Sequence, residues 1–329
     1  MKSSIKRWAN MVCCGGIGLL AAFTASTGAG QAYPVKPVRL IAPFPPGGSS
    51  DLIARIVAQR LSEGFPNQVI IENRPGAGSN LGSQLAARAA PDGYTLLITS
   101  VTAAINVSLF RNPGYDLVKD FTPLSKLAVG PTALVVHPSV PAHNVPQFIK
   151  LAQSRPGQLN YGSGGNGTPS HICGEMFRLM AKVNIAHVPY KGTGQSVTDL
   201  MAGQIHFVFA SMPVVFPHMK TGRLRTLAVT GAKRTPLAPD LPTVAESGLP
   251  GYAFDSWWGL VTNTGVPQAI INTLSTETRR VLQLPDVKER FADLGIDVAQ
   301  STPAELASFT RSEIDRFAKI IRDTGIRAD

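Results

Sequence analysis

Apolar positions follow two different periods along this chain, and each change of period marks a boundary between elements. Residues 38–41 form a short apolar run typical of a buried strand, and a proline- and glycine-rich loop at 43–48 ends it. From 52 to 61 the apolar residues recur at helical spacing. The segment therefore predicts a strand, a glycine loop and a helix. Free backbone N–H groups at such a helix N-terminus suit a small anion, for example a carboxylate.

Three residues at the predicted start of this helix are capping candidates. Ser49, Ser50 and Asp51 each suit the N-cap position. Asp51 has a second interpretation, because an N-cap carboxylate keeps spare lone pairs with which to orient a ligand. A single loop of this kind is about as often an ordinary turn that binds nothing. The binding interpretation gains weight because the same order of elements recurs.

A second glycine-rich loop follows at 73–80, and the order of strand, glycine-rich loop and helix recurs at 159–180 and 185–201. Strands that alternate with helices predict an α/β chain with largely parallel sheets. Thr99 and Ser100 end another apolar strand, where ligands of open α/β sheets bind. Further strands are predicted at 126–136, 205–209, 224–229 and 251–261, a helix at 145–154, and a helical region at 267–321 in which Thr302–Glu305 forms a capping box.

Two of these strands predict how the chain is divided. The strand at 126–136 has Gly130 and Pro131 at its middle, which predicts a bend and a crossover between lobes, and 251–261 is the return crossover. Two crossovers enclosing an α/β unit imply two lobes with the ligand cleft between them. The expected limits are 33–130 plus 253–329 for lobe 1 and 131–252 for lobe 2.

The N-terminus is predicted to be a signal peptide. Lys2, Lys6 and Arg7 precede an apolar stretch at 11–22 that is too short to span a bilayer, and small residues then lead to a cleavage site near Ala32. We therefore expect residues 1–32 to be removed and the mature protein to be periplasmic. Removal of these residues lowers the formal net charge from +10 to +7.

Composition and charge exclude several classes of function. With 44% hydrophobic and 16% charged residues the chain is an ordinary globular protein. The mild basicity is spread along the sequence without a dense basic run, so we expect no nucleic-acid binding. Cys173 is the only cysteine after residue 32, which excludes an internal disulfide in the mature chain. The six histidines are not tightly spaced, and we expect no metal site.

The sequence matches two motifs of enzymes only in part. Gly162, Gly164 and Gly167 match a dinucleotide-binding spacing, but Pro189–Lys191 stands where the acidic residue for the ribose is needed. Ser163 lacks the glycine two residues earlier that a hydrolase elbow requires. Loops of glycine, serine, threonine and asparagine without an assignable nucleophile–base pair favour a binding site over a catalytic one, and no cofactor is implied.

Six segments together resemble one family, the Bug proteins, which are the extracytoplasmic substrate-binding proteins of tripartite tricarboxylate transporters. The similarity runs from about Tyr33 to the C-terminus. It is carried by the segments 43–51 (PFPPGGSSD), 72–78 (ENRPGAG), 90–96 (APDGYTL), 160–171 (NYGSGGNGTPSH), 188–192 (VPYKG) and 242–248 (PTVAESG).

The resemblance implies a type II periplasmic-binding-protein fold, in which two α/β lobes joined by two crossover strands close on a ligand. It also implies a small carboxylate ligand held by loop amides and water, delivery to integral-membrane permease subunits, and no enzymatic activity. We expect a monomer. Carried over by position, the ligand-binding residues would be Phe44, Gly48, Ser49, Asp51, Thr99, Ser100, Ser163, Asn166, Gly167, Thr168, Tyr190 and Gly192.

The ligand and the downstream partner stay open at this stage. Family members often carry acids where this chain has His206 and Ala210, which makes an amino-acid ligand less favoured and leaves di- or tricarboxylates and aromatic acids. Two alternative functions are a periplasmic hydrolase that uses the same cleft and a ligand sensor for a signalling receptor. The sequence does not identify the permease.

Overall fold

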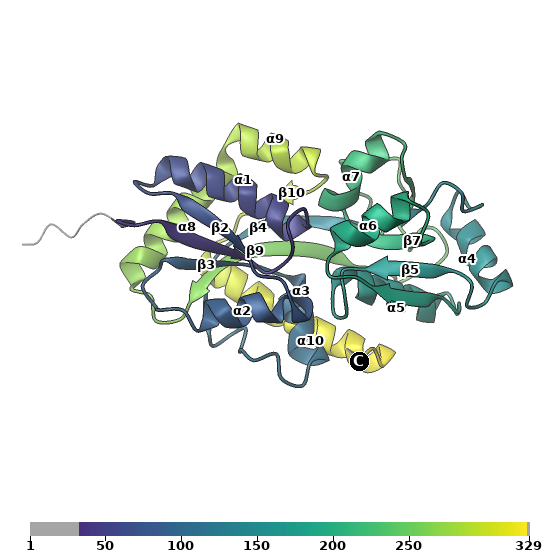
Figure 1. Ribbon diagram of the computed structural model, residues 1–329, viewed down its shortest axis with the longest axis horizontal. Coiled ribbons are helices and arrows are strands. Elements are labelled where there is room, and N and C mark those ends of the chain that lie inside the picture. Colours follow the sequence, from purple (N-terminus) through teal and green to yellow (C-terminus); the bar gives the residue numbers. More distant parts are fainter. Residues whose placement is uncertain (1–32, 328–329) are drawn as a thin grey trace, which may run out of the picture. The chain divides into compact units, whose positions relative to one another are not determined.

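The computed structural model describes residues 33–327, and the predicted signal peptide lies outside them. In this part of the chain no helix combines the length and the apolar character that a membrane span requires. Strands and helices alternate along it (Figure 1), as the periodicity predicts.

The first lobe is built on a mixed sheet. β1 lies between β2 and β3, parallel to both, and β9 and β4 continue the sheet antiparallel, in the order β2-β1-β3-β9-β4. The short strand β10 pairs with β4. The bounds are β1 Val38–Ala42, β2 Val69–Asn73, β3 Thr95–Ser100, β4 Phe121–Val136, β9 Asp255–Asn263 and β10 Asp297–Val298.

The second lobe repeats this plan. β5 lies between β6 and β7 and is parallel to both, while β4 pairs antiparallel with β7 and β8. The bounds are β5 Asn160–Ser163, β6 Ala186–Pro189, β7 Phe207–Ser211 and β8 Arg225–Val229. The two lobes and their crossovers confirm the predicted fold class.

β4 belongs to both sheets, and its partner changes at the predicted bend. It pairs with β9 as far as Pro131 and with β7 from Thr132 onward. Thr230 links the middle of β4 to the start of β9. Its hydroxyl accepts from the Thr132 N–H (3.0 Å) and lies within hydrogen-bond distance of the carbonyl oxygens of Thr132 (2.9 Å) and Phe254 (2.7 Å), to one of which its single hydrogen is donated at a time. The exact limits of the lobes remain a prediction.

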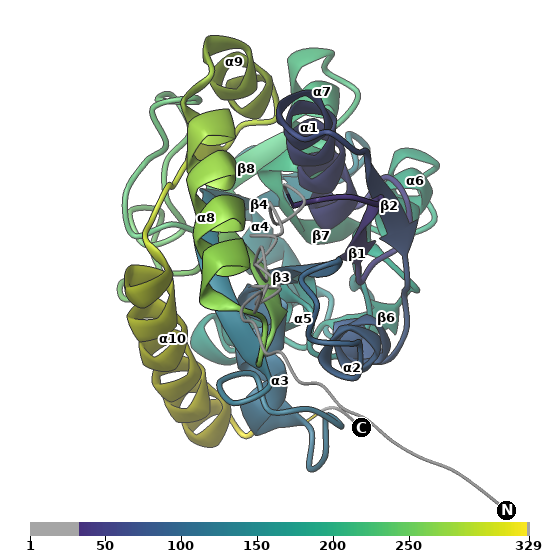
Figure 2. The same ribbon diagram turned by 90° about the vertical axis from the view of Figure 1, so that its left-hand side faces the viewer.

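Helices cover the sheets of both lobes (Figures 1 and 2). The inner strands are therefore buried on both faces, and every residue of β3 and β7 is buried. α10 packs against α3 and β4, and α8 packs against α1. The bounds are α1 Ser49–Gly64, α2 Asn80–Ala87, α3 Val101–Leu109, α4 Val145–Ser154, α5 Pro169–Met180, α6 Thr193–Met201, α7 Met212–Lys220, α8 Gln268–Gln283, α9 Pro285–Asp293 and α10 Pro303–Thr324.

Candidate functional site

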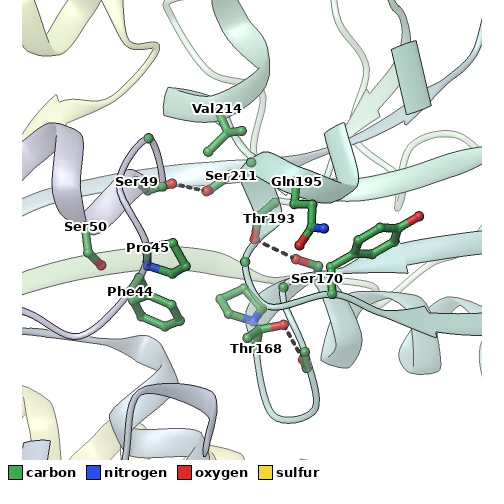
Figure 3. Close-up of a pocket in the computed structure, with 18 of the residues that line it drawn as sticks. Phe44, Pro45, Ser49, Ser50, Thr168, Ser170, Thr193, Gln195, Ser211 and Val214 are labelled. Carbon is green, nitrogen blue, oxygen red and sulfur yellow. Dashed lines mark hydrogen bonds between the residues drawn. The ribbon is translucent and has the colours of Figure 1, made fainter. Parts of the chain in front are cut away.

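A cavity of about 1130 Å³ lies where loops of the two lobes meet. Its wall is made largely by the segments that follow the C-terminal ends of β1, β2, β3, β5, β6 and β7. This is where ligands bind in open α/β sheets. Figure 3 shows Phe44, Pro45 and Ser49 on one side, facing Thr168, Ser170, Thr193, Gln195 and Ser211 on the other.

Six helices begin at this cavity: α1, α2, α3, α5, α6 and α7. Their N-cap residues all line it, and none of them forms a side-chain cap. Gly48 and Gly192 have no side chain, and the hydroxyls of Ser79, Ser100, Thr168 and Ser211 accept no hydrogen bond from their own helices. Of the four helices whose N-caps do not line the cavity, α4 and α10 are capped by the side chains of Asn144 and Thr302, and α8 and α9 follow Pro267 and Leu284, which have no capping group. The positive ends of six helix dipoles and unused capping groups therefore face one space, which favours an anion there.

The charges of the lining side chains also favour an anion in the cavity. No aspartate or glutamate occurs among the described residues that line the cavity. The lining side chains that can carry a positive charge are Lys191, which is exposed, and His218. An anion in this cavity therefore meets no fixed negative side-chain charge in its wall.

The second glycine-rich loop is strained where it meets the cavity. Gly76, Ala77, Gly78 and Ser79 all have positive φ, at 137°, 47°, 59° and 80°. Ala77 and Ser79 are the unusual members, since non-glycine residues rarely adopt this conformation. The hydroxyl of Ser79 is buried and has no hydrogen-bond partner within the described residues. Strained residues that persist cluster at binding sites, because the surrounding structure has to hold them.

The structure brings seven of the twelve predicted ligand-binding residues to the cavity wall: Phe44, Gly48, Ser49, Ser100, Thr168, Tyr190 and Gly192. The other five do not line it: Asp51, Thr99, Ser163, Asn166 and Gly167. That the seven contact a ligand remains a prediction.

Asp51 lies behind the wall and orders the first loop. The helix begins at Ser49 with Gly48 as its N-cap, so the prediction that Ser49, Ser50 or Asp51 caps it is wrong. The Asp51 carboxylate instead accepts from the Gly47 N–H (2.9 Å), the Arg55 guanidinium (2.9 Å) and the Asn73 amide (3.0 Å). Burial raises the pKa of Asp51, but these hydrogen bonds outweigh burial and keep the pKa below its ordinary value.

Thr99 lies away from the cavity because of strand geometry. Successive side chains of β3 point to opposite faces, so Thr99 and Ser100 do not reach the same space. Ser100 lines the main cavity, whereas Thr99 borders a separate crevice of about 70 Å³.

Gly167 forms a close contact between the lobes, since an added Cβ would lie 2.7 Å from Oδ1 of Asn106 on α3.

Ser163 has a histidine partner that the sequence did not reveal. Its hydroxyl lies 2.6 Å from Nε2 of His187, and it accepts from the Gly165 N–H. His171 stacks on His187 with ring centroids 4.5 Å apart, and its Nδ1 accepts from the Gly167 N–H. Ser163 is fully buried outside the cavity wall, and burial together with His171 lowers the pKa of His187 to about 4. The pair therefore supports the loop and does not present an activated nucleophile.

The lowered pKa of His187 predicts that the protein loses stability on mild acidification. The pKa of His187 is lower in the folded than in the unfolded chain, so between these values the unfolded state binds more protons. The contribution of neutral His187 to the free energy of unfolding is complete above about pH 6.5 and declines as the pH falls toward 4. From pH 7 to 5.5 we expect the free energy of unfolding to fall by about 1 kcal/mol, measured by urea titration. In His187→Gln the decline should be shallower; an equal decline would contradict this assignment.

Several lining residues were not among the predicted ones, notably Ser170, Thr193, Gln195 and Ser211. Ser211 ends β7 as Ser100 ends β3, so the rule that selects hydroxyls at strand ends would have found it, had the strand not been predicted to end at 209. Thr193 and Gln195 lie in the first turn of α6, directly after the glycine-containing loop that follows β6. Between the lobes, the hydroxyls of Ser49 and Ser211 lie 2.5 Å apart, a contact that sequence does not indicate (Figure 3).

Residues 53–326 match the model of the tripartite tricarboxylate transporter family receptor, TctC. The chain belongs to this receptor family, which includes the Bug proteins. BugT of Bordetella pertussis is 34% identical over 314 residues, which cover 95% of this chain and 96% of BugT.

Two similar TctC-type structures were solved with ligands. Rpa4515 of R. palustris with adipate has a TM-score of 0.87 and 34% identity, covering 90% of this chain and 99% of that one. MatC from Rhodopseudomonas palustris with bound malate has a TM-score of 0.84 and 31% identity, covering 88% and 100%. Members of the TctC/Bug family are substrate-binding proteins, not enzymes. The protein is accordingly an extracytoplasmic solute-binding protein, and the hydrolase alternative is set aside.

Proposed function

We propose that this TctC/Bug protein captures a small carboxylate in the cavity by lobe closure and delivers it to the permease of a tripartite tricarboxylate transporter. The observation that carries the proposal is the convergence of six helix N-termini, without side-chain caps, on a wall to which residues 33–327 contribute no aspartate or glutamate. Backbone N–H groups and hydroxyls can bind a carboxylate without an arginine, as in other helix-terminus anion sites.

The wall favours a carboxylate that carries no amine. An ammonium group inside the cavity would need an acidic partner, and none lines it. Ala210, where family members often have an acid, is fully buried in β7. This supports di- and tricarboxylates or aromatic acids over amino acids, and Phe44 and Trp258 offer aromatic surface for the last class.

The proposal also covers the location of the protein, its oligomeric state and the limits of its lobes. We place the mature protein in the periplasm as a monomer, with residues 1–32 removed near Ala32 as a signal peptide. The periplasmic binding protein BugD, with a TM-score of 0.87, is a relative that supports this location. We assign residues 33–130 and 253–329 to one lobe and 131–252 to the other, with closure about the Thr230 contacts.

The test is a thermal-shift panel on purified protein that begins at Tyr33, refolded from denaturant to remove any ligand carried from the host. Dicarboxylates, tricarboxylates, aromatic acids and amino acids are compared. We expect at least one amine-free carboxylate to raise Tm and to be recovered chemically unchanged. For a ligand held at a hundredfold excess over Kd the gain is about 2.7 kcal/mol.

Three outcomes would count against the proposal. A shift by aspartate or glutamate that exceeds that of every amine-free acid would overturn the ligand class. Chemical conversion of the bound acid would overturn the binding role. Recovery of a signalling receptor, and not a permease, on the ligand-loaded protein after cross-linking in the native membrane would reassign the function to sensing.

A further inference from the structure

The helices around the cavity do not contribute equally. α1, α2, α3 and α5 meet it only through their first turn or the residue before it. α6 and α7 line it along much of their length, as far as Met201 and His218. The cavity therefore extends well past the six helix N-termini, on the side where α7 contacts both α6 and α1.

The lining residues on these two helices form continuous faces. On α6, Val197 and Met201 are four residues apart, and Gly194 and Thr198 lie beside them. Residues at this spacing share one face of a helix. α7 shows the same spacing twice, in the pairs Pro213 and Pro217, and Val214 and His218. Figure 3 shows Val214 pointing from α7 toward the space beneath it.

The extension differs in chemistry from the ring of N-termini. Its walls are mainly apolar, formed by Val197, Met201, Pro213, Val214 and Pro217, and Leu52 of α1 adds to them. His218 stands at the far end of the α7 face. From Thr193 to Met201 the helical rise corresponds to roughly 12 Å, which is more than a carboxylate group alone would occupy. The total volume of about 1130 Å³ also slightly exceeds the usual range of about 300–1000 Å³ for ligand pockets.

We propose that the α6–α7 face is a subsite for the hydrocarbon body of an elongated carboxylic acid, whose carboxylate is held at the ring of helix N-termini. This inference rests on the proposed function and names its ligand class more narrowly. Because both helices belong to the second lobe, that lobe discriminates between ligands by the length of their hydrocarbon chain. The carboxylate is held between the two lobes.

The test is a chain-length series. Binding of unbranched monocarboxylates and α,ω-dicarboxylates from four to ten carbons is measured by calorimetry on the refolded mature protein. Each added methylene is expected to lower Kd about fourfold, equivalent to about 0.8 kcal/mol, until the face is filled. A steeper gain for the dicarboxylates at one length would mean that the second carboxylate reaches His218.

Two variants localise the effect. Thr198→Trp places a large side chain on the lining face of α6, and it should flatten the dependence of Kd on chain length. Met201→Gln, which keeps the size and adds polarity, should reduce the gain only for the longer acids. Ala202→Trp is the matched control, since Ala202 is exposed next to Met201 but does not line the cavity. The control should retain the wild-type dependence.

Failure of this inference can be told apart from failure of the proposed function. If short acids bind but Kd does not fall with chain length, the subsite is refuted and carboxylate binding stands. A dependence that survives both Thr198→Trp and Met201→Gln would place the hydrocarbon chain elsewhere and also refute the assignment. If no acid of any length binds, both proposals fail.

Discussion

Replacing Ser170 with aspartate is expected to weaken carboxylate binding at least a hundredfold while leaving the fold intact. Ser170 is the second residue of α5, lines the cavity and lies 3.4 Å from the hydroxyl of Thr193. An acid in the first turn of a helix is normally stabilising, by roughly 0.3–1 kcal/mol. Here the same charge would face the ligand, and two like charges about 4 Å apart repel by about 4 kcal/mol at an effective dielectric constant near 20.

Calorimetric titration with the best acid from the thermal-shift panel gives Kd, and the Tm of the ligand-free variant checks the fold. Ser170→Asn is the matched control, because it has a similar size to aspartate and no charge. We expect it to lose far less affinity than Ser170→Asp. Equal affinity in the aspartate variant and the wild type would mean that the carboxylate does not bind near the start of α5.

Substituting valine for Gly192 is expected to prevent full closure and to weaken binding at least tenfold. The φ angle of Gly192 is 169°, an extended conformation that any residue can adopt, so the loop itself is not strained by the change. An added Cβ would, however, lie 3.0 Å from Cγ of Pro45 in the opposite lobe. Overpacking of this kind costs about 1–3 kcal/mol, and here only the closed state bears the cost.

Small-angle scattering with and without ligand measures closure, and calorimetry measures affinity. Gly194→Ala serves for comparison, because its Cβ would meet the carbonyl oxygen of Gly47 at an ordinary 3.6 Å. Adding Pro45→Ala to Gly192→Val should restore part of the affinity by removing the clashing Cγ. Normal ligand-induced compaction in Gly192→Val would contradict the assignment of this contact to the closed state.

The elements of the fold follow closely from the sequence. The helix predicted at 145–154 is α4 with the same bounds, and the capping box at Thr302–Glu305 is present at the start of α10. These features depend on the spacing of apolar residues and on capping groups a few residues apart. Both signals are contained in short stretches of the sequence. The bend at Gly130 and Pro131 was also predicted, although β4 begins five residues earlier than expected.

The site was predicted less completely, for reasons that lie outside local sequence. The three strand–loop–helix units predicted where ligand-facing loops occur, and all three loops reach the cavity. Sequence did not separate residues that face the cavity from those that support it. Asp51 and Ser163 flank these loops, at the start of α1 and at the end of β5. The Asp51 carboxylate accepts from the Gly47 N–H, and the Ser163 hydroxyl contacts His187 of β6.

By itself the sequence determined the alternating α/β plan, the two crossovers, the glycine loops at helix starts and the resemblance to the Bug family, because each is encoded within short segments. Tertiary structure alone decided that six helix N-termini converge, without side-chain caps, on one wall that has no aspartate or glutamate among the described residues. It also decided that α6 and α7 extend this site along apolar faces. Those properties arise from pairing and packing between residues distant in the chain, which local pattern does not specify.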